Sequence, residues 1–135
     1  MSEKAVTRIE RCHAYLLGRA SGGDTLYGIN TGFGDLATTR VDDLVALQRN
    51  LLISHACGVG EPLPAKVVKA MLLLKVKALS QGHSGVSVTT VQRLLDHWNA
   101  SVLPVVPSQG SLGASGDLAP LAHLVLPLIG EGEVV

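Results

Sequence analysis

Apolar residues recur three or four positions apart in several long segments of this chain. Residues 3–18, 42–56 and 66–81 each follow this spacing, as does the segment after Ser87. A period near 3.6 residues indicates amphipathic helices. A further apolar face follows Asp117. The pattern predicts a mainly α-helical fold with no internal domain boundary.

Residues that favour or disfavour helices indicate where each one begins and ends. The glycines from Gly18 onward should end the first helix, because glycine is costly inside helices and common after them. Ser87 or Thr89 should cap the fourth helix, since a hydroxyl can accept a free N–H of the first turn. Pro104 and Pro107 should stop that helix.

Two of the predicted helices, at 42–56 and 66–81, carry much apolar surface. The chain has 135 residues, of which 47% are hydrophobic, and a chain of this length buries only part of its surface. Apolar patches larger than a few hundred Å² tend to mark contacts with partners. We therefore expect these faces to be covered by other polypeptide.

Composition and charge exclude several classes of protein. The formal net charge is zero, which gives no electrostatic basis for binding nucleic acid. The uncharged run Leu118–Ile129 is too short to span a bilayer, and charges near the N-terminus argue against a signal peptide. Cys12 and Cys57 are far apart and form neither a disulfide framework nor a metal-binding pair. We expect no metal site and a reducing, cytoplasmic setting.

The segment from Pro107 to Pro120 is chemically the most unusual part of the chain. Glycines at 110, 113 and 116 allow backbone conformations that are closed to other residues. Ser115 lies among them, in the tripeptide Ala114-Ser115-Gly116. On spacing alone, the segment could be a Gly/Ser-rich turn before a helix.

The longer string Gly110–His123, which reads GSLGASGDLAPLAH, resembles the histidine ammonia-lyases within the aromatic amino acid ammonia-lyase family. The resemblance implies that Ala114-Ser115-Gly116 closes on itself to form methylidene-imidazolone (MIO). In that reaction the Gly116 amide nitrogen attacks the Ala114 carbonyl, and Ser115 loses its hydroxyl as water. The product is an electrophile made from the chain itself, so no external cofactor is implied.

A second glycine-rich segment, Tyr27–Gly34, carries two of the four aromatic residues of the chain. Its composition is typical of a structured loop. One interpretation is a turn that packs Tyr27 and Phe33 into the core. By resemblance it is the mobile active-site loop of the family, and Tyr27 matches the catalytic tyrosine that acts as a base.

His55 lies near the C-terminal end of the predicted helix 42–56. A histidine there often pairs with the helix dipole or is a satisfied core residue. However, the string Ser54–Pro62 resembles the histidine-specific lyases, in which the matching histidine contacts the imidazole of the substrate. The resemblance thus makes His55 a substrate-binding residue and a marker of specificity.

Asp117 follows the tripeptide and precedes the last predicted helix. It is well placed to cap that helix with its side chain, and the N-terminal end of the helix would then adjoin Ser115. The resemblance adds a second role, in which Asp117 assists the cyclisation that forms MIO.

Together the resemblance implies a homotetrameric ammonia-lyase that converts L-histidine to trans-urocanate and ammonia. A tyrosine- or phenylalanine-directed lyase or aminomutase is an alternative, which Ser54-His55 and Ala122-His123 oppose. A non-catalytic helical assembly module with unprocessed Ser115 is another. Family members are several times longer and bind the substrate carboxylate through later residues. We therefore expect residues 1–135 to be the N-terminal, MIO-bearing portion of a longer enzyme, inactive alone.

Overall fold

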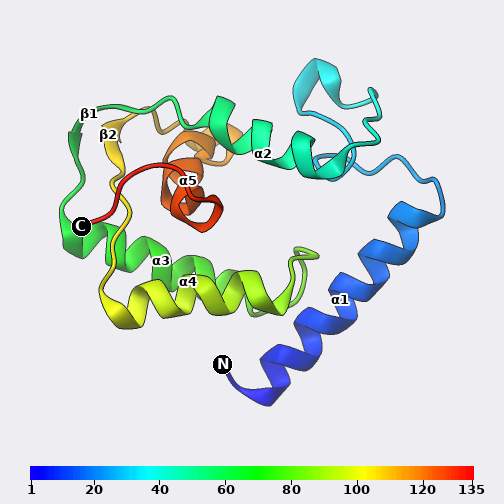
Figure 1. The fold of residues 1–135 in the computed structure, drawn as a ribbon, viewed down its shortest axis with the longest axis horizontal. Coiled ribbons are helices and arrows are strands. Elements are labelled where there is room, and N and C mark those ends of the chain that lie inside the picture. The colour runs from blue at the N-terminus through cyan, green and yellow to red at the C-terminus, as the bar shows by residue number, and fades with distance from the viewer.

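The computed structural model describes residues 1–135 and is built mainly of helices (Figure 1). The α-helices are α1 Glu3–Ser21, α2 Leu44–His55, α3 Ala65–Leu79, α4 Val88–Ala100 and α5 Leu118–Val125. Short 3-10 helices cover Gly34–Leu36, Gly113–Ser115 and Leu126–Ile129. The strands are β1 Val59–Pro62 and β2 Pro107–Gln109. The predicted mainly α fold is confirmed.

The core lies where α3 and α4 pack side by side (Figure 1). Val68, Leu72 and Val76 follow one another at four-residue spacing on α3 and are buried, because that spacing repeats one face of a helix. Ile9 of α1 and Leu124 of α5 complete the same cluster. Segments distant in the sequence therefore share one apolar core.

Helix boundaries agree with the predictions in part. Ser87 accepts a hydrogen bond from the Thr90 N–H at 3.2 Å, which confirms it as the cap of α4. Helix α1 continues through Gly18 to Ser21 and ends at Gly22, so Gly18 does not end it but a later one of the predicted glycines does. The end of α4 was also misplaced, because the left-handed conformation of Ser101 (φ 53°) ends it before the first proline.

The strand pair was not predicted. Strands β1 and β2 run antiparallel, with Val59 opposite Gln109 and Pro62 opposite Pro107. Glycines and prolines in these stretches are typical of helix boundaries and turns, and the pairing joins segments some 50 residues apart that no local pattern connects. Its consequence is to hold the end of α2 beside the segment that leads to Ser115.

Helix α5 packs between α2 and the α3–α4 pair (Figure 1). Helix α2 contacts α5 but has no fully buried residue, and Val45 on its outer surface is 81% exposed. This surface agrees with the expectation that α2 carries apolar area beyond what the chain covers. No helix in the structure is both long enough and apolar enough to cross a bilayer.

Candidate active site

The tripeptide Ala114-Ser115-Gly116 occupies a tight turn that several hydrogen bonds hold. Gly113–Ser115 form a 3-10 helix, and the Gly116 N–H donates to the Gly113 carbonyl at 3.1 Å. The carbonyl of Leu112 accepts the N–H groups of Ser115 and Asp117 at 3.0 and 3.2 Å. It also accepts the Ser115 hydroxyl at 2.8 Å. A 3-10 turn is tighter than an α-helical turn, so the tripeptide is compactly folded.

The conformation of Gly116 fits the proposed cyclisation. Its φ is 91°, in the left-handed region, which costs a residue with a Cβ about 1–2 kcal/mol. A Cβ added there would meet nothing within 4 Å. The requirement for glycine at this position is therefore conformational rather than steric.

Asp117 does not cap α5 with its side chain, which corrects the sequence prediction. It precedes the helix in a left-handed conformation (φ 56°), and its side chain makes no hydrogen bond to the first turn. Instead its Oδ1 accepts the Ser111 hydroxyl at 2.5 Å. Only its backbone carbonyl joins the helix, by accepting the Leu121 N–H at 3.2 Å. The carboxylate is thus held beside the tripeptide.

The glycine-rich loop Tyr27–Gly34 is held in place by buried polar residues of its own and by hydrogen bonds from α2. Asn30 and Thr31 are buried, and the Asn30 amide accepts from the Leu26 N–H at 2.7 Å and donates to the Asp24 carbonyl at 2.8 Å. Gln48 of α2 donates to the carbonyls of Gly28 and Ile29 at 3.0 and 2.9 Å. Sequence reasoning missed Gln48, because a polar residue on an exposed helix face carries no local signal.

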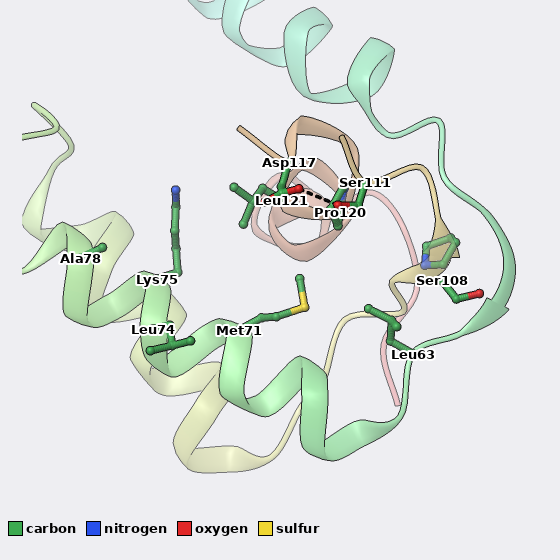
Figure 2. Close-up of a pocket in the computed structure, with 11 residues that line it drawn as sticks. Leu63, Met71, Leu74, Lys75, Ala78, Ser108, Ser111, Asp117, Pro120 and Leu121 are labelled. Atoms are coloured by element: carbon green, nitrogen blue, oxygen red, sulfur yellow. Dashed lines mark hydrogen bonds between the residues drawn. The ribbon is translucent and has the colours of Figure 1, made fainter. Parts of the chain in front are cut away.

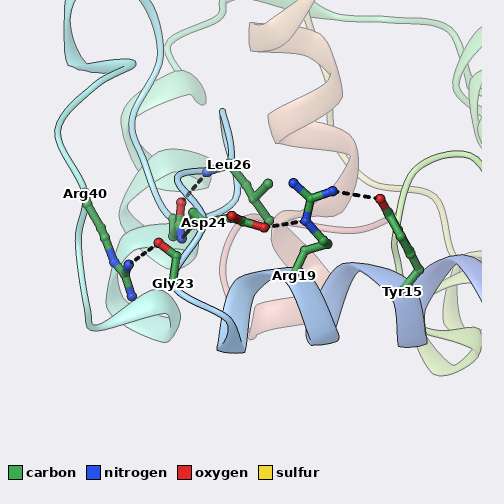
Figure 3. Close-up of polar contacts among 7 residues, drawn as sticks. Tyr15, Arg19, Gly23, Asp24, Leu26 and Arg40 are labelled. Atoms are coloured by element: carbon green, nitrogen blue, oxygen red, sulfur yellow. Dashed lines mark hydrogen bonds and ion pairs between the residues drawn. The ribbon is translucent and has the colours of Figure 1, made fainter.

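Side chains on both sides of this loop hold the segment that leads into it (Figure 3). Arg19, near the end of α1, donates to Asp24 and to the Tyr15 hydroxyl. Arg40 donates to the Gly23 carbonyl at 2.7 Å from the far side of the loop. These contacts link α1 to the segment that leads into Tyr27.

Tyr27 and His55 are brought together through Phe33. The Tyr27 and Phe33 ring centroids lie 5.5 Å apart at 65°, and Phe33 and His55 lie 5.5 Å apart at 88°. Edge-to-face contact of this kind is the favoured arrangement of aromatic rings. Tyr27 is 62% exposed, so the interpretation that it packs into the core was wrong.

The imidazole of His55 has a defined orientation. Its Nδ1 lies 2.7 Å from the Leu51 carbonyl oxygen, and since a carbonyl only accepts, Nδ1 carries the hydrogen. In the neutral ring Nε2 is then an acceptor. His55 can therefore accept a hydrogen bond from an N–H group of a ligand.

The site residues form two groups, one of Ala114–Gly116 with Asp117 and the other of Tyr27 with His55. The two groups are connected through the segments that follow α2 and flank α5. The Gly58 N–H donates to Nε2 of His123 at 3.0 Å. Burial lowers the pKa of His123, because a less polar surrounding disfavours the cation. The Ser115 hydroxyl itself bonds to Leu112 rather than to Tyr27 or His55. The predicted residues therefore lie on neighbouring segments without direct polar contact.

A cavity of about 480 Å³ adjoins the Asp117 side of the tripeptide (Figure 2). Its wall on α3 includes Met71 and Lys75, and Ser111 and Asp117 form part of the opposite wall. Tyr27, His55 and Ser115 do not line it. The cavity therefore lies beside the Ser111–Asp117 pair, outside the Tyr27–His55 group.

Comparison with known proteins assigns the chain to one class, the aromatic amino acid lyases. The family model described as "Aromatic amino acid lyase" matches residues 1–135, and the chain belongs to this family.

Similarity to individual relatives is strong but covers only part of their length. The histidine ammonia-lyase of Myxococcus xanthus is 56% identical over an alignment 136 positions long, which covers 98% of this chain and 27% of that protein. The solved histidine ammonia-lyase of Trypanosoma cruzi superposes with a TM-score of 0.86 at 43% identity, covering 99% of this chain and 25% of the other. The solved tyrosine aminomutase of Streptomyces globisporus superposes with a TM-score of 0.93 at 34% identity, covering 99% of this chain and 25% of the other. The chain thus spans about a quarter of such relatives.

Proposed function

We propose that this chain is the MIO-bearing N-terminal portion of a histidine ammonia-lyase. The whole enzyme would convert L-histidine to trans-urocanate and ammonia. The observation that carries the proposal is the tight turn at Ala114–Gly116, with its left-handed Gly116 and the adjacent Asp117 carboxylate. The 56% identity to a histidine ammonia-lyase supports histidine as the substrate.

Ala114, Ser115 and Gly116 are the residues that would form MIO. When formed, this group supplies an electrophilic alkene to the amine of the substrate. Asp117 would assist the ring closure as a proton acceptor, because its carboxylate is held next to the turn by Ser111. The N-terminal end of α5, which begins one residue later at Leu118, would add a positive dipole to the same place.

Tyr27 and His55, which lie apart from the tripeptide and Asp117, would act on the substrate directly. In its phenolate form Tyr27 would take the β-proton, since a base must lie within reach of the proton that it removes, and its exposed ring can meet a ligand. His55 would accept the N–H of the substrate imidazole at Nε2, because Nδ1 is committed to the Leu51 carbonyl. Phe33 would hold the two rings at a fixed separation.

A second candidate is a tyrosine- or phenylalanine-directed lyase or aminomutase. The TM-score of 0.93 to a tyrosine aminomutase favours it, because substrate choice in one fold rests on a few side chains. The pair Ser54-His55 argues for histidine instead, since an imidazole acceptor suits an imidazole substrate better than a phenyl ring.

The test is to express the full-length enzyme and incubate it separately with L-histidine, L-tyrosine and L-phenylalanine. We expect urocanate from L-histidine at the highest kcat/KM of the three. Mass spectrometry of the peptide containing Ala114–Gly116 should show the loss of two waters. An unmodified peptide together with unchanged amino acids would instead favour a non-catalytic helical assembly module.

The exposed surface of α2 supports a further part of the proposal, assembly into a homotetramer. The full-length enzyme should then sediment as a single species of four subunits. Residues 1–135 would be inactive alone, because the groups that bind the substrate carboxylate would come from outside them.

A further inference from the structure

Gly58, Gly110 and His123 form a close crossing of three segments, which we call the glycine crossing. The Gly58 N–H donates to His123 Nε2 at 3.0 Å. A Cβ on Gly58 would lie 3.1 Å from that nitrogen and 3.2 Å from the Gln109 carbonyl oxygen. A Cβ on Gly110 would lie 3.0 Å from the Gly58 Cα. The segments therefore approach more closely than side chains would allow.

The glycine crossing joins the two groups of site residues. Gly58 follows His55 by three residues, and Gly110 precedes Ser115 by five. His123 belongs to α5, the helix that starts directly after Asp117. If Gly58 moved away from α5, the end of α2 with His55 would move with it, while Ser115 would keep its place next to α5. The separation between His55 and Ser115 would then increase.

The hydrogen bond also defines the state of His123. Because Gly58 donates, Nε2 must carry a lone pair, and the ring is neutral with its hydrogen on Nδ1. The burial that lowers the pKa of His123 favours the same state. His123 therefore acts as an acceptor that cannot be replaced by an apolar side chain of similar size.

We propose that His123 is a positioning residue that sets the separation between His55 and the Ala114–Gly116 turn, and thereby the binding of the substrate ring. This inference rests on the proposed function, because it assigns His55 to the substrate. His123 lies outside the reacting atoms and acts through Gly58.

Three variants of the full-length enzyme test this role. His123→Leu removes the acceptor at similar volume, His123→Gln restores an acceptor oxygen at similar reach, and Gly58→Ala disturbs the contact from the other side. Losing one such hydrogen bond typically costs about 1 kcal/mol. We therefore expect about a fivefold increase in KM for L-histidine in the Leu and Ala variants. The increase in the Gln variant should be less than about twofold.

Two further measurements separate positioning from general stability. Hydrogen exchange at the Gly58 amide should accelerate in His123→Leu and return toward wild type in His123→Gln. The near-ultraviolet absorbance of the MIO group should be equal in all variants, and kcat should change less than KM.

The outcomes that would overturn the inference differ from those that would overturn the proposed function. An active wild type whose KM is unchanged in both His123→Leu and Gly58→Ala would overturn the role of His123 alone. Unchanged exchange at Gly58 in His123→Leu would do the same. A wild type without turnover of L-histidine, L-tyrosine or L-phenylalanine would overturn the proposed function and this role with it. If another of these amino acids is preferred, the KM comparison is made with that substrate.

Discussion

Phe33 meets His55 edge to face, with ring centroids 5.5 Å apart and planes inclined by 88°. Phe33 also meets Tyr27 edge to face, with ring centroids 5.5 Å apart and planes inclined by 65°. One aromatic side chain thus connects the loop after α1 to the last turn of α2. The separation of the two proposed substrate-facing residues therefore depends on a residue that does no chemistry itself.

Replacing Ser115 with Ala in the full-length enzyme should abolish the near-ultraviolet absorbance of MIO and the turnover of L-histidine. The cause is the lost hydroxyl, whose elimination creates the alkene. Circular dichroism should show a folded protein, because Ser115 is exposed and makes one side-chain hydrogen bond. Ser108→Ala, at an exposed serine of β2, is the matched control and should keep both properties. Wild-type turnover by Ser115→Ala would refute the MIO assignment.

Replacing His55 with Leu should lower kcat/KM for L-histidine by about ten- to a hundredfold, since an imidazole N–H of the substrate would lose its acceptor. The MIO absorbance should persist, because His55 makes no hydrogen bond to the tripeptide. His83→Leu, at an exposed histidine, serves as the control. The deciding measurement is the ratio of histidine to tyrosine turnover, and an unchanged ratio would leave His55 with a structural role only.

Replacing Asp117 with Asn should slow MIO formation while preserving the fold. Asparagine tolerates the left-handed conformation, and its amide oxygen can still accept the Ser111 hydroxyl, but it lacks the charge that would take a proton. Asp117→Ala should lower the free energy of unfolding by about 1–2 kcal/mol, because alanine is strained at φ 56°. Mass spectrometry of the Ala114–Gly116 peptide gives the processed fraction. Complete processing in Asp117→Asn would limit this residue to a structural part.

The stability of the protein should decrease in acid partly through His123. Its pKa is lowered by burial from an ordinary value of 6.5. As the pH falls below that value, the unfolded chain binds a proton that the folded state resists, so the free energy of unfolding decreases. His123→Gln should remove this part of the pH dependence. Denaturant unfolding of both proteins between pH 5 and 8 measures the difference, and parallel curves would contradict the assignment.

The isolated 135-residue chain should associate or aggregate. Helix α2 leaves Leu44, Val45 and Ile53 exposed, and wet apolar surface costs ~25 cal/mol per Å². The free-energy cost of leaving several hundred Å² of apolar surface uncovered is comparable to the free energy of unfolding of a typical domain, about 5–15 kcal/mol. Sedimentation velocity decides the matter. A compact monodisperse monomer that binds no hydrophobic dye would show that these faces need no partner.

Much of the fold follows from local patterns. Val68, Leu72 and Val76 recur every four residues, and this spacing defines a buried helix face whatever the face packs against. The glycines around Ser115 likewise indicate an unusual backbone through residue type alone, since only glycine reaches φ 91° at little cost. The helices and the position of the tight turn could therefore be predicted.

The tertiary structure decided which segments meet. The pairing of β1 with β2, the contact of Gly58 with His123 and the place of Phe33 between Tyr27 and His55 join residues that are distant or unrelated in the sequence. The partner of Asp117 was also hidden, because its carboxylate does not cap the helix and instead accepts the Ser111 hydroxyl. The sequence alone determined the helices and the tripeptide because periodicity and glycine content are local properties. The arrangement of the site depended on long-range packing, which exists only once the chain has folded.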